Sequence, residues 1–150
     1  MSQDGERAAQ SLAGQVLEFD LGSEAYCVDI QYVTEIVNPT DVTEAPNTPA
    51  HVEGIMDLRG TTTTIVDPKQ LLRIDDGGAA NRVVVFEPSL FDDGRPVGWL
   101  VDRTRRVTEV SEDEVDEPPD DDEFIRGIVT LDGGFVVWTD PGVAIESATG

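Results

Sequence analysis

The residues that could do chemistry are few and scattered along this 150-residue chain. His51 is the single histidine, and it follows a proline-containing stretch with no nucleophile motif beside it. No serine stands in the strained-turn context that presents a catalytic hydroxyl. The chain has no phosphate-binding glycine loop, no dinucleotide fingerprint and no Cys/His spacing for a metal. This inventory favours a binding protein over an enzyme, with no catalytic residue, metal or cofactor predicted.

Carboxylates are so abundant that no pair of them stands out. The most acidic run, EPPDDDE from Glu117 to Glu123, lacks the spaced ligands and the glycine of a calcium loop. We interpret it as a solvated acidic loop. A small acidic β-barrel hydrolase that uses paired carboxylates stays open as the alternative function, and it would need a deep pocket holding two carboxyl groups in unequal environments.

Arginine offers the chemistry of recognition. Arg59 stands beside Gly60 at an expected turn, where the glycine lets another surface approach and the guanidinium presents a planar fork of donors. A surface ion pair with a nearby carboxylate is an equally favoured interpretation of Arg59. Arg103, Arg105 and Arg106 form a positive cluster that is expected mainly to balance local carboxylates.

The formal net charge is −21, from ten basic and thirty-one acidic residues, and Lys69 is the only lysine. Such a chain repels nucleic-acid phosphates and anionic membranes, which makes both poor partners. Its self-repulsion largely vanishes in molar salt, where the screening length is about 3 Å. Because acidic residues occur in every segment, the composition indicates a salt-rich cytoplasm like that of extreme halophiles.

The lone Cys27 lies in an apolar run and is expected to be a buried hydrophobe without a disulfide. No signal peptide or membrane-length apolar run is evident, so a soluble, cytoplasmic protein is expected.

The elements that hold these residues are built twice. The stretch GIMDLRGTTTTIVDP (54–68) recurs without a gap as GIVTLDGGFVVWTDP (127–141), 73 positions later (127 − 54 = 73). Each copy predicts a β-hairpin around a glycine turn, followed by a short helix that Asp caps and Pro begins. The offset also relates Asp29 to Asp102, since each ends an apolar run. We expect two related halves, roughly 15–78 and 79–146, that are able to exchange strands, with flexible tails at 1–14 and 147–150.

Other elements follow from local patterns. Strands are expected on both sides of the Gly22-Ser23 turn, and Asp29 is expected to open a helix with Ile30, Val33, Ile36 and Val37 on one face. This prediction places Ile36 in the core and Glu35 on the opposite, wetter side. The run Thr61–Thr64 suits a sheet edge or a solvated face. Ser111 and Glu114 fit a capping box.

An ordered series of segments carries a family likeness. LEFDLGSEAYCVDIQYVTEIV, NTPAHVEGIMDLRGTTTTIVDP, VGWLVDRTRRV and FIRGIVTLDG, spread over residues 15–145, resemble the CheW family of chemotaxis coupling proteins, here in a halophilic type. The resemblance implies a mainly β fold of two five-stranded, SH3-like β-barrel subdomains with a few short helices. It also implies a non-enzymatic adaptor, a scaffold of two-component signal transduction. Such an adaptor couples the cytoplasmic tips of methyl-accepting chemotaxis receptors to the regulatory domain of the histidine kinase CheA, in arrays beneath the membrane.

The resemblance also points to partner-binding residues, without indicating which of them meet the kinase and which the receptor. They are Ile30, Val33 and Glu35 on the expected helix, Gly54, Arg59 and Gly60 in the first hairpin, and Val101 and Asp102 in a groove contributed by the second half. The sequence departs from the family pattern at Thr61–Thr64, which is usually aliphatic, and at Pro68, where leucine is common.

Overall fold

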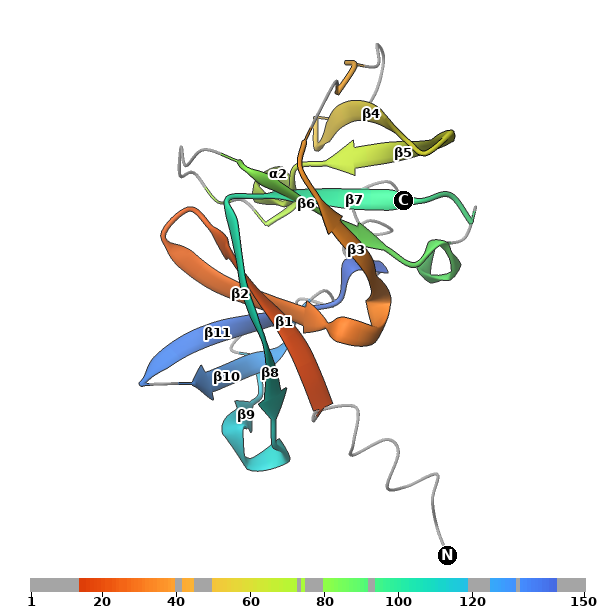
Figure 1. Ribbon diagram of the computed structural model, residues 1–150. Coiled ribbons are helices and arrows are strands. Elements are labelled where there is room, and N and C mark those ends of the chain that lie inside the picture. The colour runs from red at the N-terminus through yellow and green to blue at the C-terminus, as the bar shows by residue number, and fades with distance from the viewer. Residues whose placement is uncertain are drawn as a thin grey trace, which may run out of the picture.

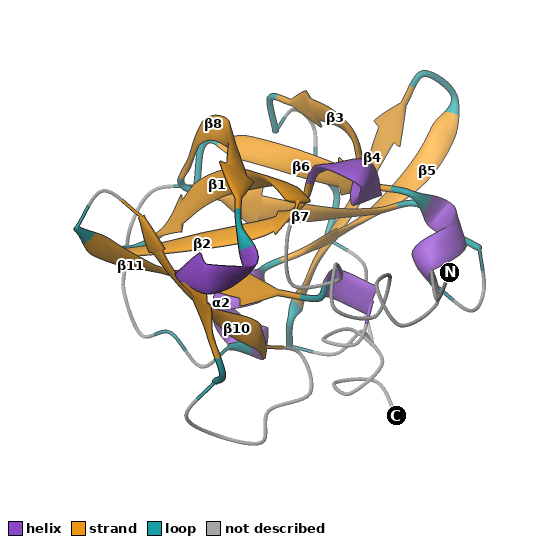
Figure 2. Ribbon diagram, turned by 90° about the horizontal axis from the view of Figure 1, so that it is seen from below, coloured by secondary structure: helices purple, strands orange, loops and turns teal. Residues whose placement is uncertain are grey.

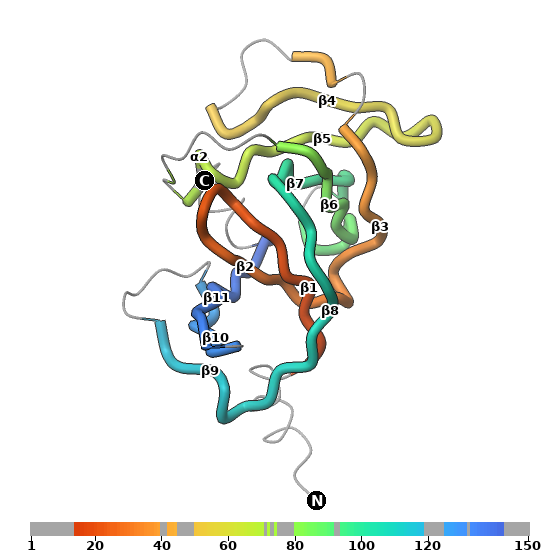
Figure 3. The backbone as a smooth tube through the Cα atoms, turned by 60° about the vertical axis from the view of Figure 1, so that its left-hand side comes forward, coloured from red at the N-terminus to blue at the C-terminus, as the bar shows by residue number. Residues whose placement is uncertain are grey.

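The computed structural model describes residues 14–39, 42–44, 50–72, 74, 80–91, 94–118, 125–131 and 133–142. Across these ranges most residues lie in strands, and the helices are short (Figure 2). The strands form two sheets, one above the other in Figure 1, and the two groups remain distinct in the turned view of Figure 3. The predicted mainly β fold is confirmed.

Sheet A has six strands in the order β8-β1-β2-β11-β10-β9, and sheet B has five in the order β3-β6-β7-β5-β4. The strands of sheet A are β1 (Gly14–Leu21), β2 (Glu24–Asp29), β8 (Arg103–Val110), β9 (Val115–Asp116), β10 (Ile125–Leu131) and β11 (Gly134–Thr139). Those of sheet B are β3 (Val33–Val37), β4 (Val52–Leu58), β5 (Thr61–Val66), β6 (Arg82–Phe86) and β7 (Val97–Val101). Short helices connect them: η1 (Ile30–Tyr32), α2 (Pro68–Leu71), η2 (Pro88–Leu90) and η3 (Glu112–Glu114).

The internal repeat holds residue by residue in the two hairpins. Adding 73 to the bounds of β4 and β5 gives the bounds of β10 and β11. Both hairpins carry a bulge at the matching place, between Val52 and Gly54 in one and between Ile125 and Gly127 in the other. The same backbone irregularity in both copies supports a common local design, since a bulge re-aims a strand.

Strands are exchanged between the two copies. β5 of the first copy pairs in parallel with β7 of the second, and β11 of the second pairs in parallel with β2 of the first. Each sheet therefore contains strands from both halves of the sequence, and five strands of sheet A repeat the order of sheet B. The numerical boundaries of the halves remain a prediction. Gly14, expected in the N-terminal tail, is the first residue of β1, and the rest of the predicted tails, 1–13 and 147–150, lies outside the described residues.

The predicted caps are present. The Asp67 carboxylate accepts a hydrogen bond from the backbone N–H of Lys69 at 3.0 Å, and Pro68 is the first residue of α2. Asp140 does the same for Gly142 at 3.1 Å. Ser111 and Glu114 form the expected capping box at η3. These local signals identified where the helices begin.

The predicted helix after Asp29 is wrong. Only Ile30–Tyr32 form a single 3-10 turn, and Val33–Val37 are strand β3, which pairs with β6. Four of its five residues are β-branched, a composition that fits a strand better than a helix. In the strand Ile36 points outward with 40% of its surface exposed, instead of lying in the core, and Glu35 is the half-buried neighbour.

The run Thr61–Thr64 is not at a sheet edge, because β5 lies between β4 and β7. Its solvated character is confirmed for Thr61 and Thr62, which are exposed, whereas Thr63 is completely buried.

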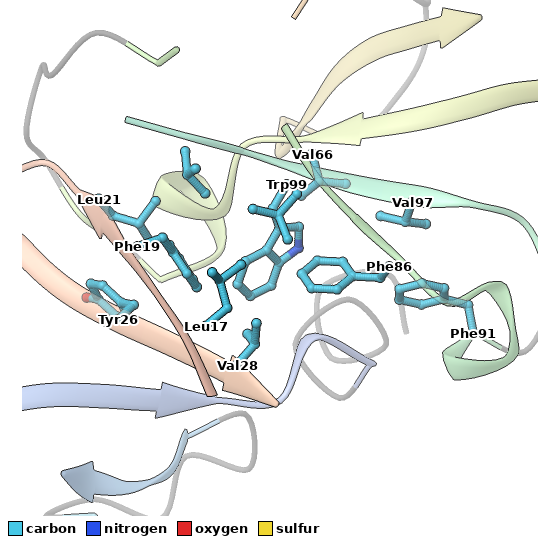
Figure 4. Packing of buried hydrophobic residues seen from close by; sticks show 12 residues of the cluster. Leu17, Phe19, Leu21, Tyr26, Val28, Val66, Phe86, Phe91, Val97 and Trp99 are labelled. Carbon is cyan, nitrogen blue, oxygen red and sulfur yellow. The ribbon is translucent and has the colours of Figure 1, made fainter. Parts of the chain in front are cut away.

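An aromatic core joins the two sheets. Trp99 from sheet B lies edge-on to Phe19 from sheet A at 6.1 Å and to Phe86 at 5.3 Å between ring centroids (Figure 4). Smaller apolar clusters fill each sheet's own interior, around Val16 and Trp138 in sheet A and around Met56 and Ile65 in sheet B. Cys27 is completely buried in sheet A, as expected. The buried residues between the sheets are Leu17, Phe19, Leu21, Tyr26, Val28, Val66, Val84, Phe86, Phe91, Val97, Trp99 and Val101.

Candidate partner-binding site

The tip of the β4–β5 hairpin is a two-residue turn made by Arg59 and Gly60. Both residues have positive φ, 51° and 85°. Such a turn matches the twist of the flanking strands, and glycine suits its second position. The Gly60 N–H lies 3.4 Å from the Asp57 carboxylate, to which it donates. This tight turn holds the Arg59 side chain out from the protein, with 71% of it exposed.

Arg59 forms an ion pair with Glu35. Its Nη2 donates to Oε2 of Glu35, whose side chain is 25% exposed. This hydrogen bond, and then the charge of the carboxylate, raise the pKa of Arg59. The pair connects the hairpin to β3, the terminal strand on the other side of sheet B. Arg59 therefore fits both interpretations, the ion pair and the exposed recognition group, because its guanidinium is bound to Glu35 while most of the side chain is in solvent.

Gly54, in strand β4 of this hairpin, allows a neighbouring segment to pack closely against the strand. Thr43 crosses the strand here, exchanging two 2.8 Å backbone hydrogen bonds with Ile55. A Cβ at position 54 would lie 2.2 Å from the Thr43 carbonyl oxygen, so only glycine allows the crossing. The repeat-related Gly127 faces the matching backbone less closely, since a Cβ there would lie 3.0 Å from the Asp116 carbonyl oxygen and 2.7 Å from Val115 Cγ1. Gly54 is buried, so it contributes to the site by allowing the backbone of the hairpin to adopt this arrangement.

Ile30 and Val33 are half-buried and pack against the core between the sheets. Val33 is opposite Phe86 in the β3–β6 pairing, two residues before Glu35. Each therefore has one apolar side in the core and another that is accessible. Together with Glu35, Arg59 and Gly60, they are the predicted residues that stay at least partly accessible on sheet B and on η1, the turn that precedes β3.

Val101 and Asp102 do not belong to this surface. Val101 is completely buried between the sheets, which excludes direct contact of its side chain with a partner in this structure. The Asp102 carboxylate is 12% exposed, and it accepts hydrogen bonds from Lys69 Nζ at 2.8 Å and from the Gly22 N–H at 2.7 Å. These contacts indicate a structural role.

The arginine cluster balances local carboxylates, as predicted. Nε of Arg103 and Nε of Arg105 donate to Asp20 at 3.2 Å and 2.8 Å. Nε of Arg106 donates to Glu18 at 3.1 Å. All three pairs join β8 to β1 within sheet A.

Sequence reasoning missed a groove on sheet A. Phe135, at the start of β11, has 72% of its surface exposed beside a hollow of about 550 Å³. Its sequence signal is an aromatic residue directly after a glycine turn, where the first copy has Thr62. Among the described residues that line the groove, Glu18 is the one carboxylate, and it is bound to Arg106. These lining residues therefore do not supply the pair of carboxyl groups that the hydrolase alternative requires. The lining residues are Glu18, Ala25, Arg105, Arg106, Leu131, Gly134, Phe135 and Val136.

Within the described ranges, no three His, Cys, Asp or Glu side chains come together in a way that could hold a metal ion. In the same part of the chain, no helix is both long and apolar enough to span a membrane.

Residues 15–149 match the CheW-like domain. The chain belongs to the CheW family of chemotaxis coupling proteins. CheW of Thermotoga maritima is 27% identical over 139 residues, which cover 90% of this chain and 89% of that protein. CheW of Rhizobium meliloti is 30% identical over 127 residues, which cover 81% of each. The crystal structure of the scaffolding protein TtCheW from Thermoanaerobacter tengcongensis superposes with a TM-score of 0.76 at 28% identity, covering 85% of this chain and 84% of that one. The CheW fold also accounts for the two sheets, each of which corresponds to one SH3-like subdomain.

Proposed function

We propose that this chain is a non-enzymatic chemotaxis adaptor that couples methyl-accepting chemotaxis receptors to the histidine kinase CheA in arrays beneath the membrane. The match to the CheW-like domain over residues 15–149 supports the adaptor class. The observation that carries the proposal is the exposed Arg59–Glu35 pair on a tight turn of sheet B, at positions where the family likeness places partner contacts. The kinase regulatory domain and the receptor tip are the expected partners.

A rigid body with outward-facing recognition groups suits a protein that holds two others in one geometry. A standard interface would bury about 800 Å² on each partner, and an exchangeable one less. The accessible sides of Ile30 and Val33 supply apolar contact, while Arg59 and Glu35 set orientation and exclude wrong partners. Gly54 and Gly60 contribute by fixing the hairpin on which Arg59 stands.

The hydrolase alternative has no specific support among the described residues. The described lining of the sheet A groove includes no second carboxylate, and Glu18 is bound by Arg106. We therefore propose a protein that does no chemistry of its own.

The test is a pull-down with two purified fragments, the CheA regulatory domain and a receptor cytoplasmic tip, in concentrated KCl. The wild-type chain should retain both fragments. Arg59→Glu should lose at least one of them. Arg103→Glu is the matched control, because it reverses an exposed, ion-paired arginine on sheet A whose partner, Asp20, remains bound to Arg105. Failure of the wild-type chain to retain either fragment would remove the proposal.

A further inference from the structure

The described elements pass between the two sheets at two places, and a repeat-related aspartate stands at each. Asp29 is the last residue of β2 in sheet A, and the chain then enters β3 of sheet B. Asp102 lies between β7 of sheet B and β8 of sheet A. The repeat offset relates them, since 29 + 73 = 102. The duplication has thus placed the same acidic residue at both crossovers.

Each aspartate binds a cation from the other copy of the repeat. Asp102 accepts from Lys69 Nζ at 2.8 Å and 3.1 Å through its two oxygens. Lys69 lies in α2, directly after the first-copy hairpin. Asp29 accepts from Nη1 of Arg126, in β10 of the second copy, at 2.8 Å. These contacts accompany the strand exchange, in which each copy's hairpin joins the other copy's sheet.

Both pairs are withdrawn from solvent. The side chains of Lys69 and Asp102 are 10% and 12% exposed, and those of Arg126 and Asp29 are 18% and 13% exposed. Dissolved ions screen such pairs much less than they screen Arg59–Glu35. The pairs also have defined geometry, because Asp102 accepts from the Gly22 N–H in the β1–β2 turn and the Arg126 guanidinium lies 5.4 Å from the centre of the Trp138 ring.

The apolar core stabilises the packing of the two sheets but does not fix their relative orientation, since apolar burial depends on area more than on orientation. Buried ion pairs have the opposite character: their net contribution to stability is small, but their geometry is specific and breaking one side is costly. Asp102 in particular binds the β1–β2 turn of sheet A and helix α2, which follows β5 of sheet B. A carboxylate that binds both sides of the junction is suited to fixing the angle between them.

Asp29 in β2 and Arg126 in β10 both belong to sheet A, so their ion pair joins strands of one sheet. We infer that the Asp102–Lys69 pair is a crossover clamp that sets the angle between sheet A and sheet B. Asp102 is then a positioning residue that acts through the fold, in place of the partner contact expected from the sequence. If the proposed adaptor function holds, on which this consequence rests, the clamp also fixes how the two partners are oriented toward each other.

The test measures the angle directly, in the protein alone. Spin labels are attached at Thr62→Cys and Phe135→Cys, exposed repeat-related positions on the two hairpins, and the distance between them is measured by double electron–electron resonance. Cys27 is completely buried, and this burial raises the pKa of its thiol, so labelling of the folded protein is confined to the introduced cysteines. The chain without introduced cysteines checks this.

The clamp is removed as a pair, so that no buried charge is left alone, and Lys69→Met with Asp102→Asn keeps an acceptor for the Gly22 N–H. Arg126→Met with Asp29→Asn is the matched control, because that ion pair is similarly withdrawn from solvent but joins two strands of the same sheet. Arg106→Met with Glu18→Gln is a second control within sheet A, at a more exposed pair. We expect a single narrow distance distribution for the wild type and both controls, and a shifted or broader one for the clamp variant.

Conservative variants keep the test decisive if a paired variant does not fold. Lys69→Arg retains the charge but changes its reach, so it should shift the mean distance in a folded protein, whereas Arg126→Lys should leave that distance unchanged. Unchanged distributions in every folded clamp variant would overturn the inference. Because the measurement needs no partner, it is independent of the adaptor proposal. That proposal would fail separately, if the wild type bound neither fragment although its clamp behaved as inferred.

Discussion

The Arg59 guanidinium donates a hydrogen bond to the Glu35 carboxylate while most of the arginine side chain stays in solvent. Arg59 lies on the hairpin turn of sheet B, and Glu35 lies on β3 at the other side of that sheet. The pair is thus a charged surface feature on a fixed framework. Exposed pairs of this kind contribute little to stability, which leaves recognition as the property that mutation should change.

Arg59→Glu should weaken binding of the CheA regulatory domain or the receptor tip by about tenfold or more, as expected for a central interface arginine. Isothermal titration calorimetry measures the loss. The far-UV circular dichroism spectrum should stay the same, because the residue is exposed. Adding Glu35→Arg restores the intramolecular pair with its charges reversed. Binding that recovers in this double variant would contradict a direct contact of Arg59 with the partner.

Val33→Asp should lower the free energy of unfolding by about 1–3 kcal/mol, because it places a carboxylate against the core between the sheets. Ile36→Asp is the matched control on the same strand, where 40% of the isoleucine is exposed, and its effect should stay within about 0.5 kcal/mol. Urea denaturation followed by tryptophan fluorescence gives both values. A larger loss for Ile36→Asp would restore the helical assignment, which put Ile36 in the core.

The single histidine gives a clear pH prediction. Burial lowers the pKa of His51 below its ordinary value of 6.5. The unfolded chain therefore takes up a proton near pH 6.5 while the folded chain does not, and stability falls as the pH drops from about 7 toward the folded pKa. One imidazole resonance in a proton NMR titration reports that pKa. His51→Gln should remove this part of the pH dependence, and a folded pKa at or above 6.5 would contradict the burial.

The acidic composition predicts salt-dependent folding. With a net charge of −21, self-repulsion should be strong in dilute buffer and should weaken as the screening length falls from about 10 Å at 0.1 M to about 3 Å at 1 M salt. The unfolding temperature should rise steeply with KCl over this range. Sucrose, which stabilises by exclusion without screening, is the control. A rise no greater in KCl than in sucrose of equal osmolality would contradict charge screening.

Local signals in the sequence were enough to predict the hairpins and caps. Glycine turns and the Asp67-Pro68 pair act within a few residues, and the repeat made each signal visible twice. β3 was missed because Ile30, Val33, Ile36 and Val37 also fit helical spacing. What decides for a strand is its pairing with β6, more than forty residues away in sequence. Tertiary pairing of this kind overrides a short local pattern.

The candidate site could be predicted only in part, because local turn signals are visible in the sequence whereas tertiary contacts are not. Arg59 and Gly60 form the turn that their types indicated, but the Glu35 contact depends on the path of β3. The ion pair of Asp102 with Lys69 could not be predicted, because nothing in the sequence near Asp102 indicates contact with a residue 33 positions earlier. The family resemblance alone placed Asp102 in a groove. The repeat did relate Asp29 to Asp102 in the sequence, whereas their common place at the crossovers became visible only with the sheet order.

The most direct test of the adaptor account is the autophosphorylation rate of CheA, reconstituted with receptor cytoplasmic fragments with and without this chain. The account predicts that receptor controls the kinase rate only when the chain is present, that Arg59→Glu lowers this control, and that Arg103→Glu preserves it. Receptor control of the kinase that is equal with and without the chain would contradict the account.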